Sequence, residues 1–296
     1  MIVDVHTHIW QSPDQLGRLD LGNSPRQNRK RPVRINAQKS AWRHVPAADP
    51  EHHWAESGAQ SGTVDRSIVL GFKSRYLQAE IPNRFVAEYV NRFPQKLIGF
   101  AGIDPTERGA AQEVIIAKEE LRLRGITVSP ANQDFHPTDS RAMRVYGECD
   151  RLHMPVLIHP SGQFTEQSKL EYGRPYLFDE VARTFPNLRM IIAQLGQPWI
   201  DETVCMLSKH HNVFADISGM LSRPWQAYNA LVSAYEHGVM DKLLFGSDFP
   251  YTSATECIEA LYSINQIAQG TNLPLIPREA LRGIIERDTL GLLGLS

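Results

Sequence analysis

Cysteine is scarce in this chain, with three residues at positions 149, 205 and 257 of 296. An odd and widely spaced set is not a disulfide framework, so small disulfide-stabilised secreted domains are excluded and a reducing compartment fits better. An excess of charge of either sign is also missing, because 31 basic and 33 acidic residues give a net charge of −2. The composition therefore gives no reason to expect nucleic acid or a membrane surface as a partner.

Long apolar runs are absent as well. No segment reaches the roughly 18 consecutive apolar residues that a membrane-spanning helix requires. The apolar run at the start of the sequence is too short and too polar for a signal peptide. We therefore expect a cytoplasmic protein that neither crosses nor binds a membrane and that acts on a small molecule.

Short runs rich in Val, Ile, Leu and Phe recur along the chain and alternate with segments that have a helical pattern. Nearly continuous hydrophobicity is typical of strands that are buried on both faces, as in parallel sheets. The predicted strands span 1–6, 65–72, 97–104, 125–130, 155–160, 188–196, 212–219 and 242–250. The predicted helices span 83–93, 109–124, 139–153, 176–185, 200–210, 225–238 and 254–269.

Eight strands, of which the second to the eighth are each followed by a predicted helix, predict the α/β class and a single (β/α)₈ TIM-barrel domain over residues 1–296. The alternative is an open doubly wound sheet, which requires a glycine-rich turn after its first strand. Here that strand is followed by "HTHIW", which contains no glycine.

One segment, residues 10–63, interrupts this alternation because it is long and polar. Within it, residues 26–34 carry five basic side chains and no acidic one. A loop of this length in a compact domain is more often functional than idle. We interpret residues 10–63 as an insertion after the first strand, either a solvated loop, a lid over an anionic substrate or a contact between subunits.

The first strand ends in a His-x-His pair, within "MIVDVHTHIW". Alternate residues of a strand share a face, so His6 and His8 point one way and Val3 and Val5 the other. The valines suit the helix-covered side, which directs the histidines into the barrel at the end where TIM-barrel active sites lie. Two protonated imidazoles would repel each other there, and a shared cation removes that repulsion. Two partly buried histidines with ordinary hydrogen bonds are the alternative.

Two later strands also end in potential metal ligands. The run "PVLIHP" ends in His159, and "LLFGSDFP" contains Asp248. Each residue alone has a common structural explanation, a core histidine or a turn-forming acid. Together with the His-x-His pair they form a set of three imidazoles and one carboxylate with room for water, which is typical of a catalytic rather than a structural site.

These motifs, with "VDVHTH", "GFAGIDP", "MPVLIHPSG" and "LLFGSDFP" in order along the whole chain, resemble the amidohydrolase superfamily. The similar branch includes aminocarboxymuconate-semialdehyde decarboxylase, aromatic-acid decarboxylases and lactonases. The resemblance implies that His6, His8, His159 and Asp248 hold one divalent metal ion, zinc first and manganese as the alternative. Thr127 stands where other branches carry a carboxylated lysine, so a two-metal site is not expected. The family's habit of forming dimers implies a homodimer.

The sequence departs from the family at Gln194, in "AQLGQPW", where relatives carry a catalytic histidine. An amide does not take up or release a proton near neutral pH, whereas imidazole does. Its NH₂ group still donates a hydrogen bond to a developing oxyanion, a role worth roughly 3 kcal/mol in other enzymes. Gln194 is therefore predicted to replace the electrophilic role of that histidine but not its acid–base role.

The first functional hypothesis is a metal-dependent hydrolase. Water activated by the metal would attack a lactone, ester or amide carbonyl, with Asp248 carrying the proton and Gln194 holding the carbonyl oxygen. The second hypothesis is a metal-dependent nonoxidative decarboxylase, which the missing histidine weakens. The third is a catalytically degenerate barrel that binds a ligand without turnover, which the intact ligand set disfavours.

Three further residues are candidates for supporting roles. Trp10 follows the histidines and is predicted to wall the substrate pocket, with a core aromatic as the alternative. Arg223 follows the seventh strand and is predicted to clamp a substrate carboxylate with two hydrogen bonds, with a surface ion pair as the alternative. Asp4 is predicted either to bond a ligand histidine or to accept hydrogen bonds from the backbone.

Overall fold

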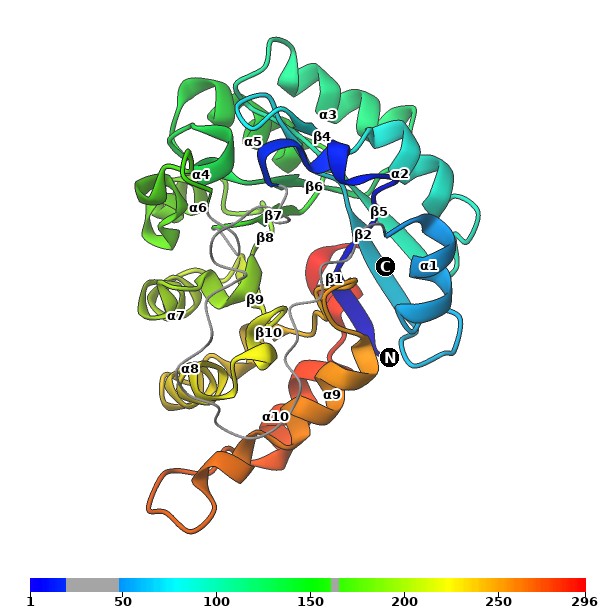
Figure 1. Ribbon diagram of the computed structural model, residues 1–296. Coiled ribbons are helices and arrows are strands. Elements are labelled where there is room, and N and C mark those ends of the chain that lie inside the picture. Colours follow the sequence, from blue (N-terminus) through cyan, green and yellow to red (C-terminus); the bar gives the residue numbers. More distant parts are fainter. Residues whose placement is uncertain (20–47, 161–164) are drawn as a thin grey trace.

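The computed structural model of the protein describes residues 1–19, 48–160 and 165–296. Its main sheet has eight parallel strands in the order β1-β2-β5-β6-β7-β8-β9-β10, arranged as a ring with helices outside it (Figure 1). The strands are β1 (Val3–His8), β2 (Arg66–Leu70), β5 (Leu97–Gly102), β6 (Gly125–Val128), β7 (Val156–Ile158), β8 (Met190–Ile192), β9 (Val213–Asp216) and β10 (Leu243–Leu244).

Backbone hydrogen bonds between β1 and the segment after β10 close the ring. The amide of Val5 donates to the carbonyl of Phe245 at 3.0 Å, and the amide of His8 donates to the carbonyl of Phe249 at 2.8 Å. The predicted α/β barrel is thereby confirmed. All eight strands run in the same direction, so their carboxyl ends meet at one rim of the barrel.

Helices form the outer layer, close to where the sequence predicts them. Asp139 caps α5, because its carboxylate accepts the amide of Arg141 at 2.8 Å. The predicted helix 254–269 is interrupted at Ser263, which separates α9 from a short 3-10 turn. The helices are α2 (Asn83–Val90), α3 (Ala110–Glu119), α4 (Pro130–Gln133), α5 (Ser140–Arg151), α6 (Asp179–Thr184), α7 (Ile200–Lys209), α8 (Pro224–Glu236), α9 (Ala254–Tyr262), α10 (Arg278–Glu286) and α11 (Thr289–Leu293).

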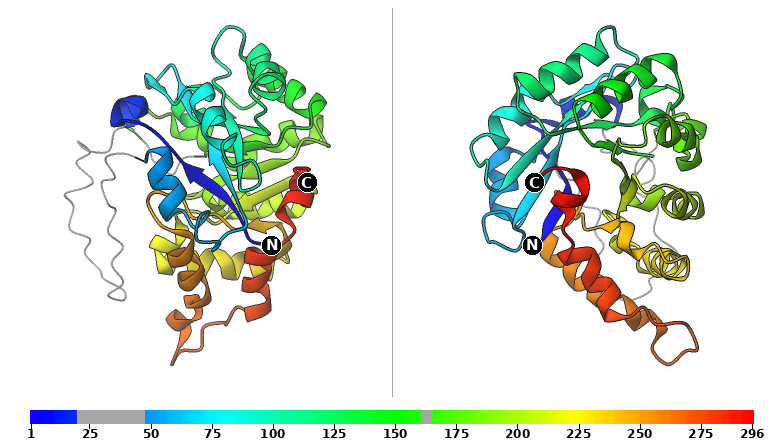
Figure 2. Two further views of the ribbon diagram at one scale, coloured as in Figure 1. Left: turned by 90° about the vertical axis from the view of Figure 1, so that its right-hand side faces the viewer. Right: turned by 180° about the vertical axis from the view of Figure 1, so that it is seen from behind.

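The amino end of the barrel is filled by the last helix. Seen from behind, the red C-terminal segment lies over the centre of the ring (Figure 2). Leu290 and Leu293 of α11 and the following Leu295 pack in one buried cluster with Val3 and Val5 of β1. The C-terminal leucines therefore close the end of the barrel opposite to the rim.

The position of these valines contradicts the direction predicted for them. Val3 and Val5 pack inside the barrel and not against the helices. The reason is a bulge in β1: Asp4 pairs with Ser67 and Thr7 with Val69, so β1 has one more residue than β2 between these pairs. A bulge of this kind reverses the alternation of side chains, and residues on both sides of it can face inward.

Part of the insertion between β1 and β2 is described. It contains a 3-10 segment (Pro13–Leu19) and α1 (Pro50–Glu56). His53 of α1 is buried and contacts both the hydroxyl of Tyr89, at 2.8 Å, and that of Thr7, at 2.9 Å. Through His53, the insertion thus contacts β1 on its outer side, opposite to the histidine pair. The basic run 26–34 lies outside the described residues, so the lid and subunit-contact interpretations stay predictions.

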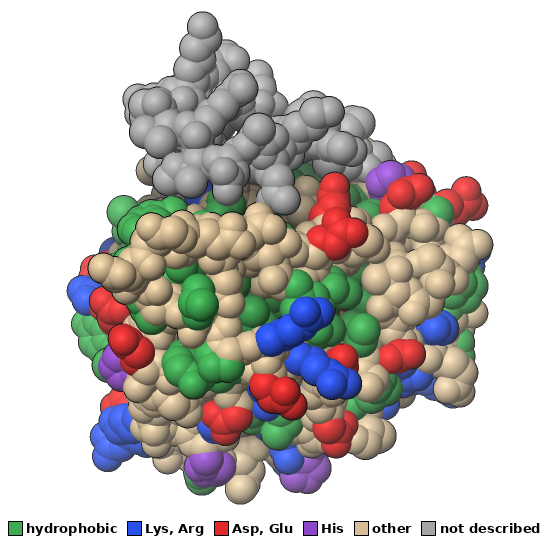
Figure 3. Space-filling model, turned by 90° about the horizontal axis from the view of Figure 1, so that it is seen from below, with side chains coloured by type: hydrophobic (Ala, Val, Ile, Leu, Met, Phe, Trp, Pro, Cys, Tyr) green, Lys and Arg blue, Asp and Glu red, His purple; other side chains and the backbone are tan. Residues whose placement is uncertain are grey.

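No helix in the described ranges is long and apolar enough to span a bilayer. On the face seen from below, hydrophobic side chains are interrupted by charged and polar groups (Figure 3). The three cysteines are free.

Candidate metal centre

Three potential metal ligands converge at the carboxyl-end rim of the barrel. His6 and His8 come from the end of β1, and Asp248 comes from the loop after β10. The Nε2 atoms of the two histidines are 3.1 Å apart. Asp248 Oδ1 lies 3.6 Å from Nε2 of His6 and 3.5 Å from Nε2 of His8. The structure thus brings together three of the four side chains that the sequence predicts as metal ligands, and their binding of a metal ion stays a prediction.

The spacing of these donor atoms fits a shared ion. Ligand atoms about 2.1 Å from a tetrahedral metal ion are about 3.4 Å from one another. The observed triangle has edges of 3.1, 3.5 and 3.6 Å. Within the described chain, one donor atom from each of these residues lies within 4.8 Å of the other two. Two imidazole nitrogens and a carboxylate oxygen are a donor set that zinc and other divalent ions accept. The site therefore fits a divalent metal ion.

His159, the fourth predicted ligand, lies beside this triangle but is not part of it. Its ring centroid is 5.0 Å from that of His6 and 5.8 Å from that of His8. The set of donor atoms that lie within 4.8 Å of one another contains His6, His8 and Asp248 only, within the residues described. Burial lowers the pKa of His159 well below its usual value, which favours the neutral, metal-binding form. Its role as a ligand stays a prediction.

A carboxylate that the sequence reading did not single out holds His6 in place. Asp216 ends β9, and its Oδ2 lies 2.9 Å from Nδ1 of His6. Ser218 Oγ lies 3.0 Å from the same nitrogen and donates to Oδ1 of Asp216. A proton on Nδ1 directed at Asp216 leaves the lone pair of Nε2 facing His8 and Asp248. The signal that could have revealed Asp216 is its place at the end of the buried run "NVFAD".

The pKa values around this pair follow from burial and charge. Burial opposes protonation of His6, but the adjacent Asp216 carboxylate outweighs that effect and raises the pKa of His6. Burial would raise the pKa of Asp216, yet His6 and the hydroxyl of Ser218 lower it below its usual value. Burial lowers the pKa of His8. Asp216 therefore stays ionised as the orienting partner of His6.

Asp4 does not bond to a ligand ring, which makes one of the two predictions for it wrong. Its Oδ1 accepts the amides of His6, at 3.1 Å, and Ser247, at 2.9 Å. Asp4 is fully buried, and this desolvation raises its pKa to about 6. The alternative prediction, hydrogen bonding to the backbone, is confirmed. Asp4 thus connects β1 to the loop that carries Asp248.

Gln194 lies beside Asp248 at the candidate metal centre, and its predicted contact with a substrate stays a prediction. Its Nε2 donates to Oδ2 of Asp248 at 3.4 Å, and its backbone amide donates to Oδ1 of Asp216 at 3.0 Å. Gln194 and Asp248 both have positive φ angles, of 54° and 65°, a conformation that is rare for residues other than glycine. A β-carbon on Gly219 would lie 2.7 Å from Asp248 Oδ2 and 3.1 Å from Gln194 Nε2. Gly219 therefore leaves the space in which these two side chains meet.

A family model agrees with this geometry. The model described as Amidohydrolase matches residues 3–284, which is nearly the whole chain. The chain belongs to the amidohydrolase family. The resemblance inferred from the motifs is thereby confirmed, whereas a search of the curated proteins found no match.

Solved structures show the same fold in relatives of this amidohydrolase. An amidohydrolase from Burkholderia multivorans with bound zinc has a TM-score of 0.67 and 14% identity, covering 100% of both chains. A probable 2-pyrone-4,6-dicarboxylic acid hydrolase from Acinetobacter baumannii has a TM-score of 0.66 and 14% identity, covering 99% of both chains. The 5-carboxyvanillate decarboxylase of Sphingomonas paucimobilis has a TM-score of 0.63 and 15% identity, covering 100% of this chain and 99% of its own.

The two other predicted substrate-binding residues lie near the rim of this amidohydrolase. Trp10 is 2% exposed, its amide donates to the carbonyl of Ala48, and its ring centroid is 6.3 Å from that of Tyr251. Arg223 is half-buried at the boundary between a 3-10 turn and α8. Trp10 therefore belongs to the buried core, as the alternative interpretation expects. Contact of either residue with a substrate stays a prediction.

The role of Asp216 leads to a testable expectation. Replacing it by asparagine preserves size but removes the negative charge that fixes the Nδ1–H form of His6. We expect Asp216→Asn to weaken metal binding by about 10- to 100-fold, measured by competition with a chromogenic chelator. Asp201→Asn, an exposed and charge-matched control on α7, should leave the affinity unchanged. Unchanged affinity in Asp216→Asn itself would remove Asp216 from the metal centre.

Proposed function

We propose that the protein is a metal-dependent hydrolase that opens a lactone, ester or amide bond in a small substrate, with a carboxylated substrate as the first choice. The observation that carries this proposal is the meeting of His6, His8 and Asp248 within 4.8 Å, with Gln194 in contact with the same carboxylate. A divalent ion at this site, zinc first and manganese as the alternative, would supply Lewis acidity and an activated water.

The two oxygens of Asp248 have different surroundings. Oδ1 faces the two histidines, and Oδ2 faces the amide of Gln194. This division lets Oδ1 serve as a ligand while Oδ2 accepts a proton from the attacking water and passes it to the leaving group. Gln194 Nε2 is then placed to donate to the substrate carbonyl oxygen as negative charge develops on it. Hydrolysis by this scheme needs no histidine at position 194.

A decarboxylase is the second candidate. Structural relatives include the 5-carboxyvanillate decarboxylase and a 2,6-dihydroxybenzoate decarboxylase. That reaction requires a proton to be delivered to a carbon atom, which Gln194 cannot supply because an amide does not titrate, so Asp248 is the first candidate to deliver it. The degenerate, ligand-binding barrel remains the third alternative. The proposal also includes contacts of Trp10 and Arg223 with the substrate. It includes the formation of a homodimer as well.

A product assay separates these functions. The metal-loaded protein is offered a panel of carboxylated lactones, amides and aromatic acids, and both acid release and carbon dioxide release are followed. We expect acid release without carbon dioxide, beginning with lactone dicarboxylates such as 2-pyrone-4,6-dicarboxylic acid. Release of carbon dioxide would show that the protein is a decarboxylase and not a hydrolase. If fully metal-loaded protein converts no compound of the panel, the degenerate barrel is favoured.

A second experiment tests the assignment of Gln194. Since Gln194 is proposed to touch substrate and not the metal, Gln194→His should change kcat while the metal content per chain stays the same. The added imidazole can titrate, so the pH profile of kcat should gain an ionisation that the natural protein lacks. Loss of metal in this variant would show instead that Gln194 supports the ligands.

A further inference from the structure

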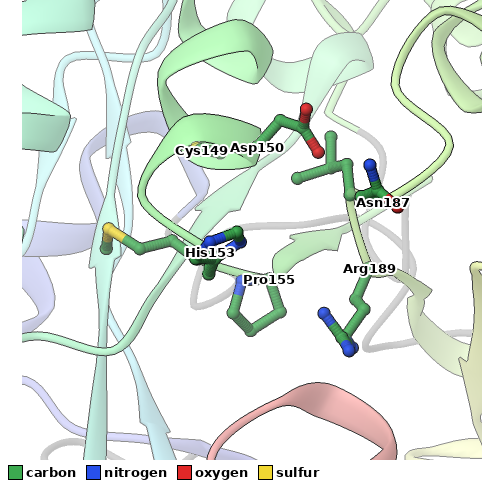
Figure 4. Close-up of a pocket in the computed structure, with 8 residues that line it drawn as sticks. Cys149, Asp150, His153, Pro155, Asn187 and Arg189 are labelled. Carbon is green, nitrogen blue, oxygen red and sulfur yellow. The ribbon is translucent and has the colours of Figure 1, made fainter.

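Two hollows lie away from the metal centre, and they differ in what they can bind. The first lies at the end of α5 beside the start of β8 and is lined by Cys149, Asp150, His153, Pro155, Asn187 and Arg189 (Figure 4). It has no room for a water molecule. Burial raises the pKa of the Cys149 thiol, so this cysteine is not a reactive thiolate. We assign it no ligand.

The second hollow is larger and is lined by arginines. It lies between the loop that joins β5 to α3 and the first turn of α5, and its volume is about 410 Å³. Small-molecule sites usually have volumes of about 300–1,000 Å³. Four guanidinium side chains from three separate segments line it, those of Arg75, Arg108, Arg141 and Arg144. None of the metal-centre residues contributes to this wall.

One of these arginines is anchored across the hollow. Arg141 forms an ion pair with Asp139, with Nη2 and Oδ2 3.0 Å apart, and its Nη1 donates to the carbonyl of Thr106 at 3.4 Å. The interaction with Arg141, with a smaller contribution from Arg144, lowers the pKa of Asp139. Arg75, Arg108 and Arg144 have no ion-pair partner in the described part of the chain. Three positive charges therefore face the hollow without a bonded acid.

The nearby acidic groups are already engaged elsewhere. Glu107 lines the hollow, but its Oε2 lies 2.7 Å from Nζ of Lys73. Asp104 is fully buried and accepts the backbone amide of Arg75 and both the amide and the hydroxyl of Thr106. Glu107 is therefore paired with a lysine and Asp104 is hydrogen-bonded within the loop, and neither forms an ion pair with one of the four guanidinium groups. An external anion would supply the missing negative charge.

We propose that this arginine-lined hollow, formed by Arg75, Arg108, Arg141 and Arg144, binds a small oxyanion that carries at least two negative charges. Guanidinium groups donate paired hydrogen bonds to phosphate and carboxylate oxygens, and several of them around one space select for multiple charge. The amino end of α3 borders the same space without a side-chain cap, and its partial positive charge adds to the attraction. Phosphates and polycarboxylates share this chemistry.

Calorimetric titration of the metal-loaded full chain tests the proposal, with inorganic pyrophosphate and citrate as the two probes. We expect saturable binding of one pyrophosphate or one citrate per hollow, weakened by added salt as charge-based binding should be. Tighter binding of pyrophosphate would identify a phosphate site, and tighter binding of citrate a polycarboxylate site. Failure of both probes to saturate would overturn the proposal.

Two variants show where the anion binds. Arg108→Ala/Arg144→Ala removes two unpaired guanidinium groups and should weaken binding by about tenfold or more, because each forms charge-assisted hydrogen bonds. Arg151→Ala/Arg183→Ala removes the same charge from exposed helix positions and should change affinity less than twofold, by loss of general attraction only. Equal weakening in both variants would show that binding follows overall charge and not this hollow.

The metal centre also attracts anions, so it needs its own control. His8→Ala disrupts the proposed ligand set but lies outside the arginine-lined hollow. Pyrophosphate binding at the hollow should persist in this variant. Its disappearance would place the anion at the metal centre and would refute the second site while leaving the proposed hydrolase intact.

Discussion

Asp248→Asn should reduce kcat/KM by about a thousandfold or more, because general acid–base catalysis is worth about 10²- to 10⁴-fold and the same carboxylate is also proposed as a metal ligand. Asparagine keeps the shape of the side chain and its hydrogen bond to Gln194, but it cannot take a proton from water. The loss should appear mainly in kcat when metal is supplied in excess. Asp248 is only 6% exposed, so the substitution changes a carboxylate that is largely shielded from solvent.

The control for this experiment is a carboxylate of the same kind outside the site. Asp201→Asn on α7 is exposed and changes the net charge equally, so it should retain full activity. Metal content must be measured alongside activity, since low metal alone would also reduce turnover. A metal-loaded Asp248→Asn protein with near-normal kcat would show that the proton is carried by another group.

His8→Ala should have the second large effect, on metal binding itself. Removing one of three donors leaves a site with too few protein ligands to hold a divalent ion tightly, and bound metal should fall from about one per chain to below about a tenth. His8 lies at the rim with its side chain 17% exposed, so the truncation should cost little folding stability. Elemental analysis gives the metal content, and thermal unfolding of the metal-free proteins gives the stability.

His237→Ala provides the matched control, because His237 is exposed at the end of α8. It should keep the full metal content. If His8→Ala kept it as well, the ligand triangle would be refuted. His159→Ala, measured in the same series, decides whether the third histidine completes the site. Metal retention there would mean that His6, His8 and Asp248 suffice.

The hydrolase and the anion site rest on different residues and can fail separately. The first depends on the three donors at the end of β1 and after β10. The second depends on guanidinium groups between α3 and α5. The two sites share the end of the barrel where the loops follow the strands, since the β5–α3 loop leaves the carboxyl end of β5. An anion held there would lie on the same side of the barrel as the metal centre.

The sequence predicted the inward direction of the histidines correctly, but part of the argument for that direction was wrong. Strand alternation placed His6 and His8 opposite to the valines of β1. In the structure both pairs face inward, because one extra residue between Asp4 and Thr7 resets the alternation. A bulge depends on how a strand pairs with its neighbour, and that pairing is not visible in the strand's own sequence.

The sequence by itself determined the class of the fold and the metal-binding character of the site, because periodic hydrophobicity and donor residues at strand ends are local properties of the chain. Only the tertiary structure decided how these pieces meet. It placed Asp216 against His6 although 210 positions separate them, and it brought Gln194 onto Asp248 through two left-handed turns. It also directed arginines from three separate segments into one hollow. Such contacts arise from the closure of the barrel and the packing of its loops, which join residues that local sequence patterns treat as independent.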